Sequence, residues 1–374
     1  MPCPRQRLIA ILAIVSFQFS STAGIPESLE RIDLLVARFL RPHMFSVPPP
    51  SISVAVGRDG RLLFAEAYGE ARPGVPATER TVYHIGSLTK QFTAAAMLRL
   101  IEQGAMAPLS GAPLTLDTSI GAIFNDVNNW TPNGQPPVTV RSLLTMTSNL
   151  PNFTLRPPPN VDPWGAVTAP RLLNELKKWS PHGWPGSFEY SNTSYFVLAQ
   201  VIGRVVSPPG SYRDYVRSAT IDKAGMTLTG FMNNYAQGSD VAEPHYKRRP
   251  AFVQPDWLNG CGDMASTTLD LFAWNSALMA GTVIGPKSVA QMFSDSARVG
   301  PTTYYGMGWF VEHDELWDKF GHSGSVPGYT SYNAIHKRRA DRSWLSVTLL
   351  TNSDGVEDLE DLANSIFDLA ELAH

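Results

Sequence analysis

The sequence predicts an α/β (α+β) fold, in which helices flank an antiparallel β-sheet and a mostly helical lobe is inserted into it. Three observations lead to this prediction. Strand-like runs lie near both ends of the chain, helical patterns lie outside them, and the long middle portion is mostly helical and rich in loops. We therefore expect residues 24–374 to form a single domain. Its α/β lobe would comprise residues 24–85 and 300–374, and its helical lobe residues 86–299.

The N-terminal portion predicts one helix and one hairpin. Apolar residues recur at helical spacing over residues 29–40, and three consecutive prolines end that pattern. Residues 51–57 and 61–68 have strand character and flank the turn Arg58-Asp59-Gly60. A turn of this composition between two such runs predicts a β-hairpin.

The C-terminal portion supplies the rest of the predicted sheet. Residues 304–312, 329–336 and 343–350 are rich in β-forming residues, with glycine, proline or charge clusters between them. A last helix follows, with apolar residues spaced for one buried face: Leu359, Leu362, Ile366, Leu369 and Leu372. Strand material at both ends of the chain is most simply accommodated in one sheet.

The first 23 residues predict a signal peptide. Arg5 and Arg7 precede an apolar run over residues 8–19, and the small residues up to Ala23 suit cleavage after that position. An uncleaved N-terminal anchor is the alternative, although the run is short for a bilayer span. A lipoprotein is not expected, because Cys3 precedes the apolar run. We expect the mature protein to be exported to the periplasm or the medium, without integral membrane association.

Composition narrows the class of partner. The chain has 374 residues, of which 43% are hydrophobic and 17% charged, with a net charge of −3 at pH 7. This balance supports a large core and argues against a nucleic-acid partner. Cys261 is the only cysteine beyond the predicted signal peptide, so no internal disulfide is expected. It has no neighbouring histidine and is expected to be a buried small hydrophobe.

Ser87 and Lys90 form the first candidate catalytic pair. No other lysine in the chain has a serine three residues before it, and a strongly helical segment ending near Gly104 follows Ser87. Ser87 should therefore lie at a helix N-terminus, with Lys90 on the same face. The helix is apolar nearly all round, so Lys90 should be poorly solvated and able to act as a neutral base. The alternative is a capping serine beside a surface lysine.

Tyr190 and Asn192 form the second candidate group. They lie between a turn and another apolar helical segment, a junction from which a phenol can point into a cleft. A tyrosine close to a cationic lysine can shuttle a proton, and an asparagine can hold a substrate amide with its donor and acceptor. The alternative is a buried tyrosine with a satisfied hydroxyl and an asparagine that caps the helix.

The string His322-Ser323-Gly324 lies between two predicted strands. Gly324 permits close backbone approach, and a strand edge that faces a cleft offers N–H groups to an oxyanion. The alternative is a glycine-rich hairpin with an incidental histidine. No acidic partner motif completes a Ser-His-Asp triad, no Gly-x-Ser-x-Gly surrounds these serines, and the eight histidines are scattered. We expect no metal and no cofactor.

Together these strings resemble the penicillin-recognising serine hydrolases, in particular the class C β-lactamases and D-alanyl-D-alanine carboxypeptidases. Three further stretches resemble the same family, and with the strings they cover most of residues 50–352: residues 142–151, residues 262–271 and Tyr305-Gly-Met-Gly-Trp309. The resemblance implies a β-lactamase/transpeptidase-like fold and a serine hydrolase that works through an acyl-enzyme.

The resemblance also implies roles for the candidate residues. Ser87 would be the acylated nucleophile, Lys90 its activator and Tyr190 the group that moves the proton to the leaving group. Asn192 would hold the substrate amide. The strand with His322, Ser323, Gly324 and Ser325 would bind substrate, His322 by contacting a carboxylate or polarising Tyr190. The backbone N–H groups of Ser87 and Ser325 would form the oxyanion hole.

Three positions depart from the family pattern. His322 stands where the family often has lysine, and a neutral histidine binds a carboxylate less well at neutral pH. Asn149 replaces a common glycine and Met146 a common histidine. We expect action on D-amino-acid-containing peptides, amides or esters, including peptidoglycan-derived ones, with D-alanyl-D-alanine carboxypeptidase-like activity leading. The alternatives are a β-lactamase, a carboxylesterase and a non-catalytic penicillin- or cell-wall-binding module.

Overall fold

The computed structural model describes residues 27–43, 49–130, 136–162, 165–206, 211–235, 240–246 and 254–373. The predicted signal peptide, residues 1–23, lies outside these ranges. Within them, no helix has the length and apolar character needed to cross a membrane.

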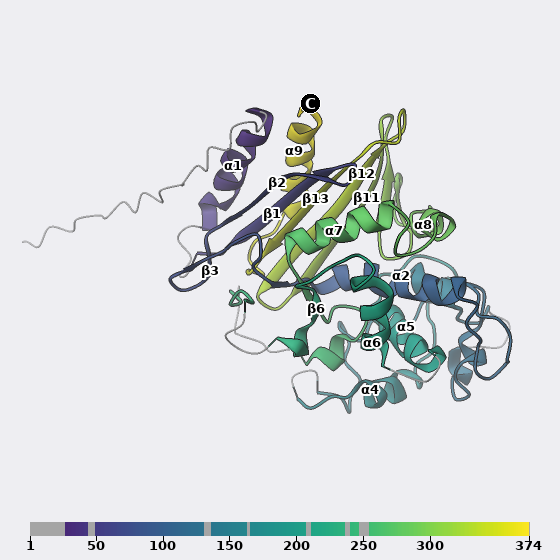
Figure 1. Ribbon diagram of the computed structural model, residues 1–374. Helices are drawn as coiled ribbons and strands as arrows, with labels where there is room; N and C mark the ends of the chain where they lie inside the picture. The colour runs from purple at the N-terminus through teal and green to yellow at the C-terminus, as the bar shows by residue number, and fades with distance from the viewer. Residues whose placement is uncertain are drawn as a thin grey trace, which may run out of the picture.

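One eight-stranded antiparallel sheet joins the two ends of the chain (Figure 1). Its order is β2-β1-β13-β12-β11-β10-β9-β8. The N-terminal hairpin β1 and β2 pairs with β13 in a register that places Ile52 opposite Thr351. The predicted sheet from both ends of the chain is therefore confirmed. The strands are β1 (Ile52–Arg58), β2 (Arg61–Tyr68), β8 (Ala297–Arg298), β9 (Thr303–Tyr305), β10 (Phe310–His313), β11 (Trp317–Val326), β12 (Tyr329–Arg338) and β13 (Trp344–Thr351).

Local backbone geometry explains how the strands begin and end. Asp59 and Gly60 join β1 to β2 with φ angles of 49° and 80°, the left-handed pair that a two-residue hairpin turn requires. The run 304–312 was expected as one strand but is divided into β9 and β10, because Gly308, with φ 83°, turns the chain between them. His322 was expected between two strands but lies inside β11, which pairs with β10 and β12 along its length.

Helices cover both faces of the sheet (Figure 1). Helix α1 (Glu27–Leu40) packs with α9 (Leu359–Glu371) on one face, where their apolar residues share a core cluster with the strands. Helix α7 (Thr268–Met279) lies on the other face. A Cβ at Gly57 of β1 would lie 2.3 Å from the Phe272 ring, so this glycine lets α7 approach closely. Helix α7 and strand β8 fall within residues 86–299 but lie on and in the sheet.

The other helices and strands of the described residues form the helical lobe and two small sheets. The helices are α2 (Thr89–Glu102), α3 (Val140–Leu144), α4 (Ala169–Leu176), α5 (Asn192–Val205), α6 (Tyr212–Val216) and α8 (Pro286–Met292). The short strands are β3 (Glu70–Arg72) with β4 (Val75–Pro76), and β5 (Tyr83–His84) with β7 (Met264–Ser266) and β6 (Gly230–Phe231). As expected, the helix after Ser87 ends near Gly104, whose φ of 68° is left-handed.

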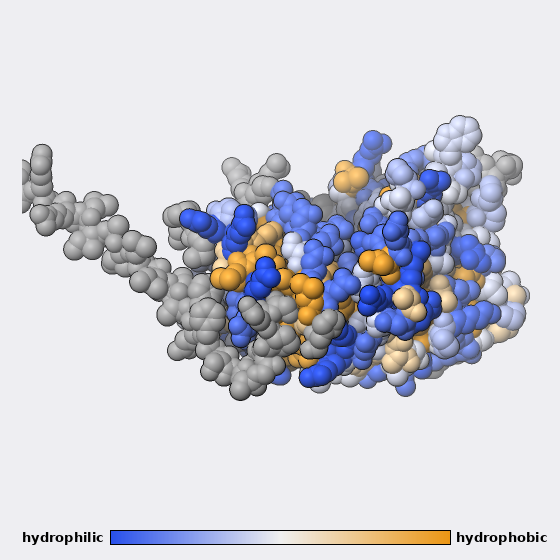
Figure 2. Space-filling model, turned by 90° about the horizontal axis from the view of Figure 1, so that it is seen from above, coloured by the Kyte–Doolittle hydropathy of each residue, from blue (hydrophilic) through white to orange (hydrophobic). Residues whose placement is uncertain are grey.

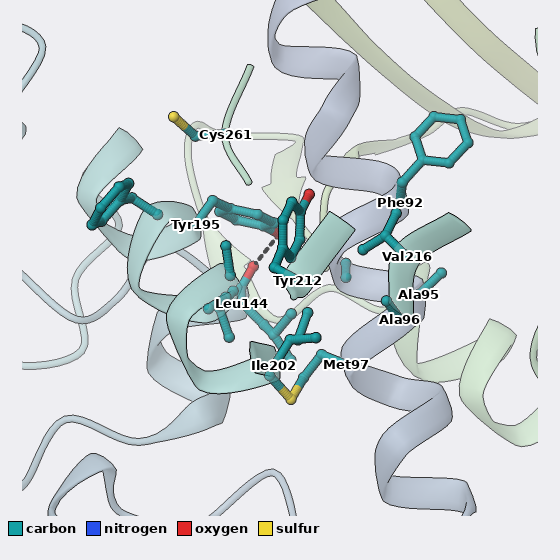
Figure 3. Packing of buried hydrophobic residues seen from close by; sticks show 14 of the residues in the cluster. Phe92, Ala95, Ala96, Met97, Leu144, Tyr195, Ile202, Tyr212, Val216 and Cys261 are labelled. Carbon is teal, nitrogen blue, oxygen red and sulfur yellow. Dashed lines mark hydrogen bonds between the residues drawn. The ribbon is translucent and has the colours of Figure 1, made fainter. Parts of the chain in front are cut away.

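Helix α2 is the centre of the larger core cluster (Figure 3). Its side chains Phe92, Ala95, Ala96 and Met97 pack among residues of α5 and α6. On its other side, Phe92 stacks on Trp274 of α7 with ring centroids 4.2 Å apart. Burial on both sides fixes the helix that carries Lys90 between the sheet-covering helix and the lobe.

The face of the molecule seen in Figure 2 is mostly polar. Seen from above, hydrophilic residues cover most of the visible face, and apolar residues gather in one area of it (Figure 2). Helices α1 and α9, which cover one face of the sheet, also carry exposed apolar side chains. Leu34 of α1 is 67% exposed, and Leu372, which directly follows α9, is 62% exposed.

Candidate active site

Ser87 lies at the junction between the sheet and the helical lobe. It occupies a short 3-10 turn, Gly86–Leu88, that leads directly into α2. Its Oγ accepts hydrogen bonds from Lys90 Nζ at 2.8 Å and from Tyr190 OH at 2.9 Å. The structure thus brings together the three residues that the sequence predicts as catalytic, although more than 100 positions separate Tyr190 from Ser87.

Lys90 is fully buried, with 0% of its surface exposed. Its Nζ donates to three oxygens: Ser87 Oγ at 2.8 Å, Asn192 Oδ1 at 2.7 Å and the Cys261 carbonyl at 2.7 Å. The Tyr190 ring lies 5.1 Å from the same nitrogen. The Lys90 nitrogen therefore has three oxygen partners, and none of them belongs to a carboxylate.

The segment 146–154 fixes the loop that carries Tyr190 and Asn192. Ser191 lies between them, and its Oγ donates to the Leu150 carbonyl at 2.8 Å. Its backbone N–H contacts Met146 Sδ at 3.4 Å. Asn192 Nδ2 donates to Thr154 Oγ1 at 2.8 Å, which leaves its Oδ1 for Lys90. Thr154 was not among the predicted site residues, and its place just beyond the family-like stretch 142–151 was the only signal for it.

The two departures in this segment adopt unusual backbone conformations. Met146 and Asn149 have φ angles of 58° and 54°, in the left-handed region that suits glycine. Asparagine tolerates this region better than other side chains, which explains how Asn149 can replace the usual glycine. The Met146 side chain reaches the backbone of Ser191, so its replacement of a histidine falls directly behind the Tyr190 loop.

His322 is buried in β11, with 2% of its surface exposed. Its Nδ1 is 2.6 Å from the Ser323 carbonyl and its Nε2 is 3.3 Å from Tyr305 OH. Burial, and then the charge of Lys90, lower the pKa of His322 to about 3, while the Ser323 carbonyl acts in the opposite direction. The imidazole is therefore neutral near pH 7 and offers no positive charge to a carboxylate. Its ring centroid lies 6.0 Å from that of Tyr190.

The backbone of β11 lies directly against the segment before Ser87. A Cβ at Gly324 would lie 2.1 Å from the Ile85 carbonyl, and a Cβ at Gly86 would lie 2.8 Å from the backbone N of Ser325. Gly86 also has a left-handed φ of 49°. Glycine is required at both positions, and the Ser325 N–H is brought beside the peptide that leads into Ser87.

The side chains of β11 alternate between two environments. Ser323 and Ser325 are exposed, while His322 and Gly324 are buried against the lobe. Ser323 lines a hollow on the α9 side of the sheet together with Tyr332 and Glu360. The strand therefore presents an imidazole near Tyr190 and backbone groups beside the segment that leads into Ser87, and the Ser323 side chain lies on the other face.

Cys261 contributes its carbonyl to the site and not its thiol. The residue is 1% exposed, and burial raises the pKa of its thiol to about 12, an effect that nearby Lys90 opposes. The thiol is therefore protonated and unreactive at neutral pH. Among the described residues, no group of three or more histidine, cysteine, aspartate or glutamate side chains could hold a metal ion.

Comparison with known sequences gives a consistent result. The family described as Beta-lactamase matches residues 36–371. PbpX of Bacillus subtilis (strain 168) is 26% identical over 322 residues, which cover 83% of this chain and 73% of PbpX. Penicillin-binding protein 4* of the same strain is 28% identical over 309 residues, 75% of this chain and 64% of that protein. The chain thus spans less than two thirds of the latter relative.

Solved structures share the fold. The octameric penicillin-binding protein homologue from Pyrococcus abyssi superposes with a TM-score of 0.75 and 26% identity, over 92% of this chain and 77% of that one. D-amino acid amidase from Ochrobactrum anthropi SV3 gives a TM-score of 0.71 and 21% identity, over 91% and 99% respectively. These matches confirm the predicted β-lactamase/transpeptidase-like fold. The chain therefore belongs to the beta-lactamase family, whose model matches residues 36–371.

Proposed function

We propose that the protein is an exported serine hydrolase that cleaves D-amino-acid-containing amides, esters or peptides through an acyl-enzyme on Ser87. One observation carries this proposal: Ser87 Oγ is the shared acceptor of Lys90 Nζ and Tyr190 OH, at 2.8 and 2.9 Å, at the N-terminus of a buried helix. A hydroxyl beside two groups that can exchange its proton is the arrangement that nucleophilic catalysis requires.

The reaction can be written from these groups. Ser87 Oγ attacks the substrate carbonyl carbon, and its proton passes to Lys90 or Tyr190, whichever has released a proton beforehand. The N–H groups of Ser87 and Ser325 stabilise the oxyanion. The leaving amine or alcohol takes a proton from Tyr190 as its bond to the carbonyl carbon breaks. Water then cleaves the acyl ester by the same path in reverse and restores Ser87.

The neutral state of His322 bears on the class of substrate. Penicillins and peptides that end in a free carboxylate need a cation or several donors for that group, and His322 supplies no charge at pH 7. We therefore place amides and esters of D-amino acids, which lack a free carboxylate, ahead of substrates that bear one. The D-amino acid amidase with the same fold is named for action on amides of D-amino acids, which lack a free carboxylate.

D-alanyl-D-alanine carboxypeptidase-like action, on peptidoglycan-derived peptides, is the second candidate. Relatives named as penicillin-binding proteins favour it, because a protein that binds penicillin has a place for a carboxylate. A β-lactamase would use the same acylation and differ in how fast water reaches the ester.

Export rests on the predicted signal peptide over residues 1–23. Secretion of the full-length chain from a bacterial host, followed by mass spectrometry of the product, tests it. A mature protein beginning at Gly24, found outside the cytoplasm, is the expected result. An unprocessed chain in the membrane fraction would replace this proposal with the N-terminal anchor.

The activity test compares three substrates and two serine variants. A D-alanine anilide, a D-alanine ester and a chromogenic cephalosporin are offered to the wild type, to Ser87→Ala and to Ser365→Ala, which alters an exposed serine on α9. We expect turnover of the anilide and ester, abolished only in Ser87→Ala. Preferred turnover of the cephalosporin would indicate a β-lactamase. Tight binding of the cephalosporin without turnover of any substrate would indicate a binding module.

A further inference from the structure

A tight turn over residues 258–263, here called the acceptor turn, faces α2 with two backbone carbonyls. The Cys261 carbonyl accepts from Lys90 Nζ at 2.7 Å, and the Gly260 carbonyl accepts from Thr93 Oγ1 at 2.8 Å. Lys90 and Thr93 are three residues apart in α2 and therefore lie on the same face of the helix. Within the described residues, the acceptor turn therefore supplies the one hydrogen-bond acceptor of Lys90 Nζ that belongs neither to Ser87 nor to the Tyr190 loop.

A buried carboxylate holds the acceptor turn in shape. Asp263 has 0% of its surface exposed and accepts from the Gly260 N–H at 3.2 Å and from Asn259 Nδ2 at 3.3 Å. Arg213 of α6 donates to it through Nε at 3.2 Å and pairs with Asp256 at 3.0 Å. The carboxylate thus bonds two residues of its own turn and one helix of the lobe, so removing it leaves buried N–H groups without partners.

Steric contact removes the remaining freedom of the acceptor turn. Gly260 has a left-handed φ of 77°, and a Cβ there would lie 2.5 Å from the Ala199 methyl of α5. Gln200, the next residue of α5, donates to Asn259 Oδ1 at 2.7 Å. The turn packs against α5, is linked to α6 through the Asp263–Arg213 ion pair and accepts hydrogen bonds from α2. The position of its Cys261 carbonyl depends on these contacts.

We propose that Asp263 and Arg213 are positioning residues for catalysis, which act by holding the Cys261 carbonyl against Lys90 Nζ. The inference rests on the proposed function, in which Lys90 exchanges a proton with Ser87. With the acceptor turn in place, the direction of one Lys90 N–H bond is fixed, and a second points at Ser87 Oγ. Without it, the Lys90 side chain can rotate away from Ser87, and catalysis depends steeply on such placement.

The ion pair makes this positioning sensitive to acid. Burial raises the pKa of Asp263 to about 6, against the opposing influence of Arg213. The other titratable groups that face it are Asp256, through Arg213, Tyr212 of α6 and the Cys261 thiol. A proton on Asp263 removes the charge that Arg213 compensates, while the Gly260 N–H keeps an acceptor.

The test uses Asp263→Ala, Asp263→Asn and the control Asp256→Asn, which removes the other partner of Arg213 without touching the acceptor turn. Hydrolysis of a D-alanine p-nitrophenyl ester is followed from about pH 5 to 9, with circular dichroism and thermal unfolding of each variant. We expect Asp263→Ala to lower kcat by about tenfold or more at neutral pH, with KM within about threefold of the wild type.

Asp263→Asn gives the readout that a purely structural role would not move. It keeps a hydrogen-bond acceptor but cannot titrate, so the ratio of its kcat at about pH 5 to that at about pH 7.5 should exceed the wild-type ratio by about threefold or more. If Asp263→Ala does not fold, the kcat ratio of Asp263→Asn alone tests the inference. An unchanged ratio, or a kcat of Asp263→Ala equal to that of Asp256→Asn, overturns the inference. A wild type without Ser87-dependent turnover refutes instead the proposed function.

Discussion

The helical lobe and strand β11 both adjoin the turn that carries Ser87 and bring different chemistry to it. The lobe contributes side chains: Lys90 and Tyr190 bond Ser87 Oγ directly, and Asn192 bonds Lys90. The strand contributes chiefly its backbone, with Gly324 pressed on Ile85 and the Ser325 N–H beside Gly86. Its one buried polar side chain, His322, is bonded to a neighbouring tyrosine and a carbonyl.

This difference assigns separate tasks to the two regions. In the proposed mechanism, the groups that exchange protons belong to a buried helix and to the loop before another helix, and both bond the same Ser87 oxygen. In the same proposal, the strand holds the substrate and the developing oxyanion. Changes in the lobe should therefore alter the rate of the chemical step, whereas changes in β11 should alter which substrates react.

The largest expected effect is that of Lys90→Ala. Removing the amine takes away one of two proton-exchanging groups and leaves Asn192 and the Cys261 carbonyl without their donor. We expect kcat on a D-amino-acid ester to fall by about 10³-fold or more. Steady-state kinetics with the folded variant measures this. A rate within about tenfold of the wild type would remove Lys90 from the mechanism.

Gly86→Ala tests the strand side of the comparison. Its Cβ would collide with the Ser325 backbone N and its φ of 49° would be strained, so the oxyanion donors should separate. A loss of about 10²-fold in kcat is expected. Gly60→Ala is the matched control, because Gly60 has a left-handed φ of 80° with no atom within 4 Å of the added methyl. Equal losses in both variants would mean that backbone strain alone is responsible.

His322→Lys asks whether the strand sets substrate choice. A lysine at this position would give a substrate carboxylate the charge that the neutral imidazole lacks. The ratio of kcat/KM for a D-alanyl-D-alanine peptide to that for D-alanine amide should rise by about tenfold. This is roughly the gain in binding that one charge-assisted hydrogen bond provides. Competition between the two substrates measures the ratio directly. An unchanged ratio would show that carboxylate recognition does not depend on position 322.

The smallest effect concerns stability at acid pH. Burial is the largest cause that lowers the pKa of His322 and His336 to about 3, from an ordinary value of 6.5. Below pH 6.5 these two histidines bind protons in the unfolded chain but stay neutral in the folded chain. The free energy of unfolding therefore falls as pH decreases from 6.5 towards 3. Each histidine contributes up to about 1.4 kcal/mol per pH unit in this window.

Asp263 acts in the opposite direction between its folded pKa of about 6 and its ordinary value of 3.8, which offsets the contribution of one histidine there. Urea unfolding at pH 7.5 and 4.5 measures the balance. A free energy of unfolding that rises on acidification would contradict the burial of these imidazoles.

Much of this site could be predicted from short strings of side chains. The spacing of Ser87 and Lys90 across the start of one helix predicts that they lie on a common face, and the Tyr190 loop is recognisable by its position before an apolar helix. The sheet from both ends of the chain followed from strand patterns that adjoin the termini. These features depend on local spacing, which a single sequence displays.

The remaining features depend on contacts between distant segments. The partner of Lys90 at Cys261 is a backbone carbonyl, which leaves no trace in residue type. Thr154 became part of the site only because its loop lies beside Asn192. Strand β11 was missed around His322 because glycine and serine weaken strand character there, while β10 and β12 supply its hydrogen bonds.

Intact-protein mass spectrometry after rapid mixing with an activated D-alanine ester tests the central claim most directly. Acylation of Ser87 predicts one added D-alanyl group on the wild type, located by peptide mapping to Ser87, formed far more slowly in Lys90→Ala and absent from Ser87→Ala. An adduct that persists in Ser87→Ala, or that maps to another residue, would contradict the account.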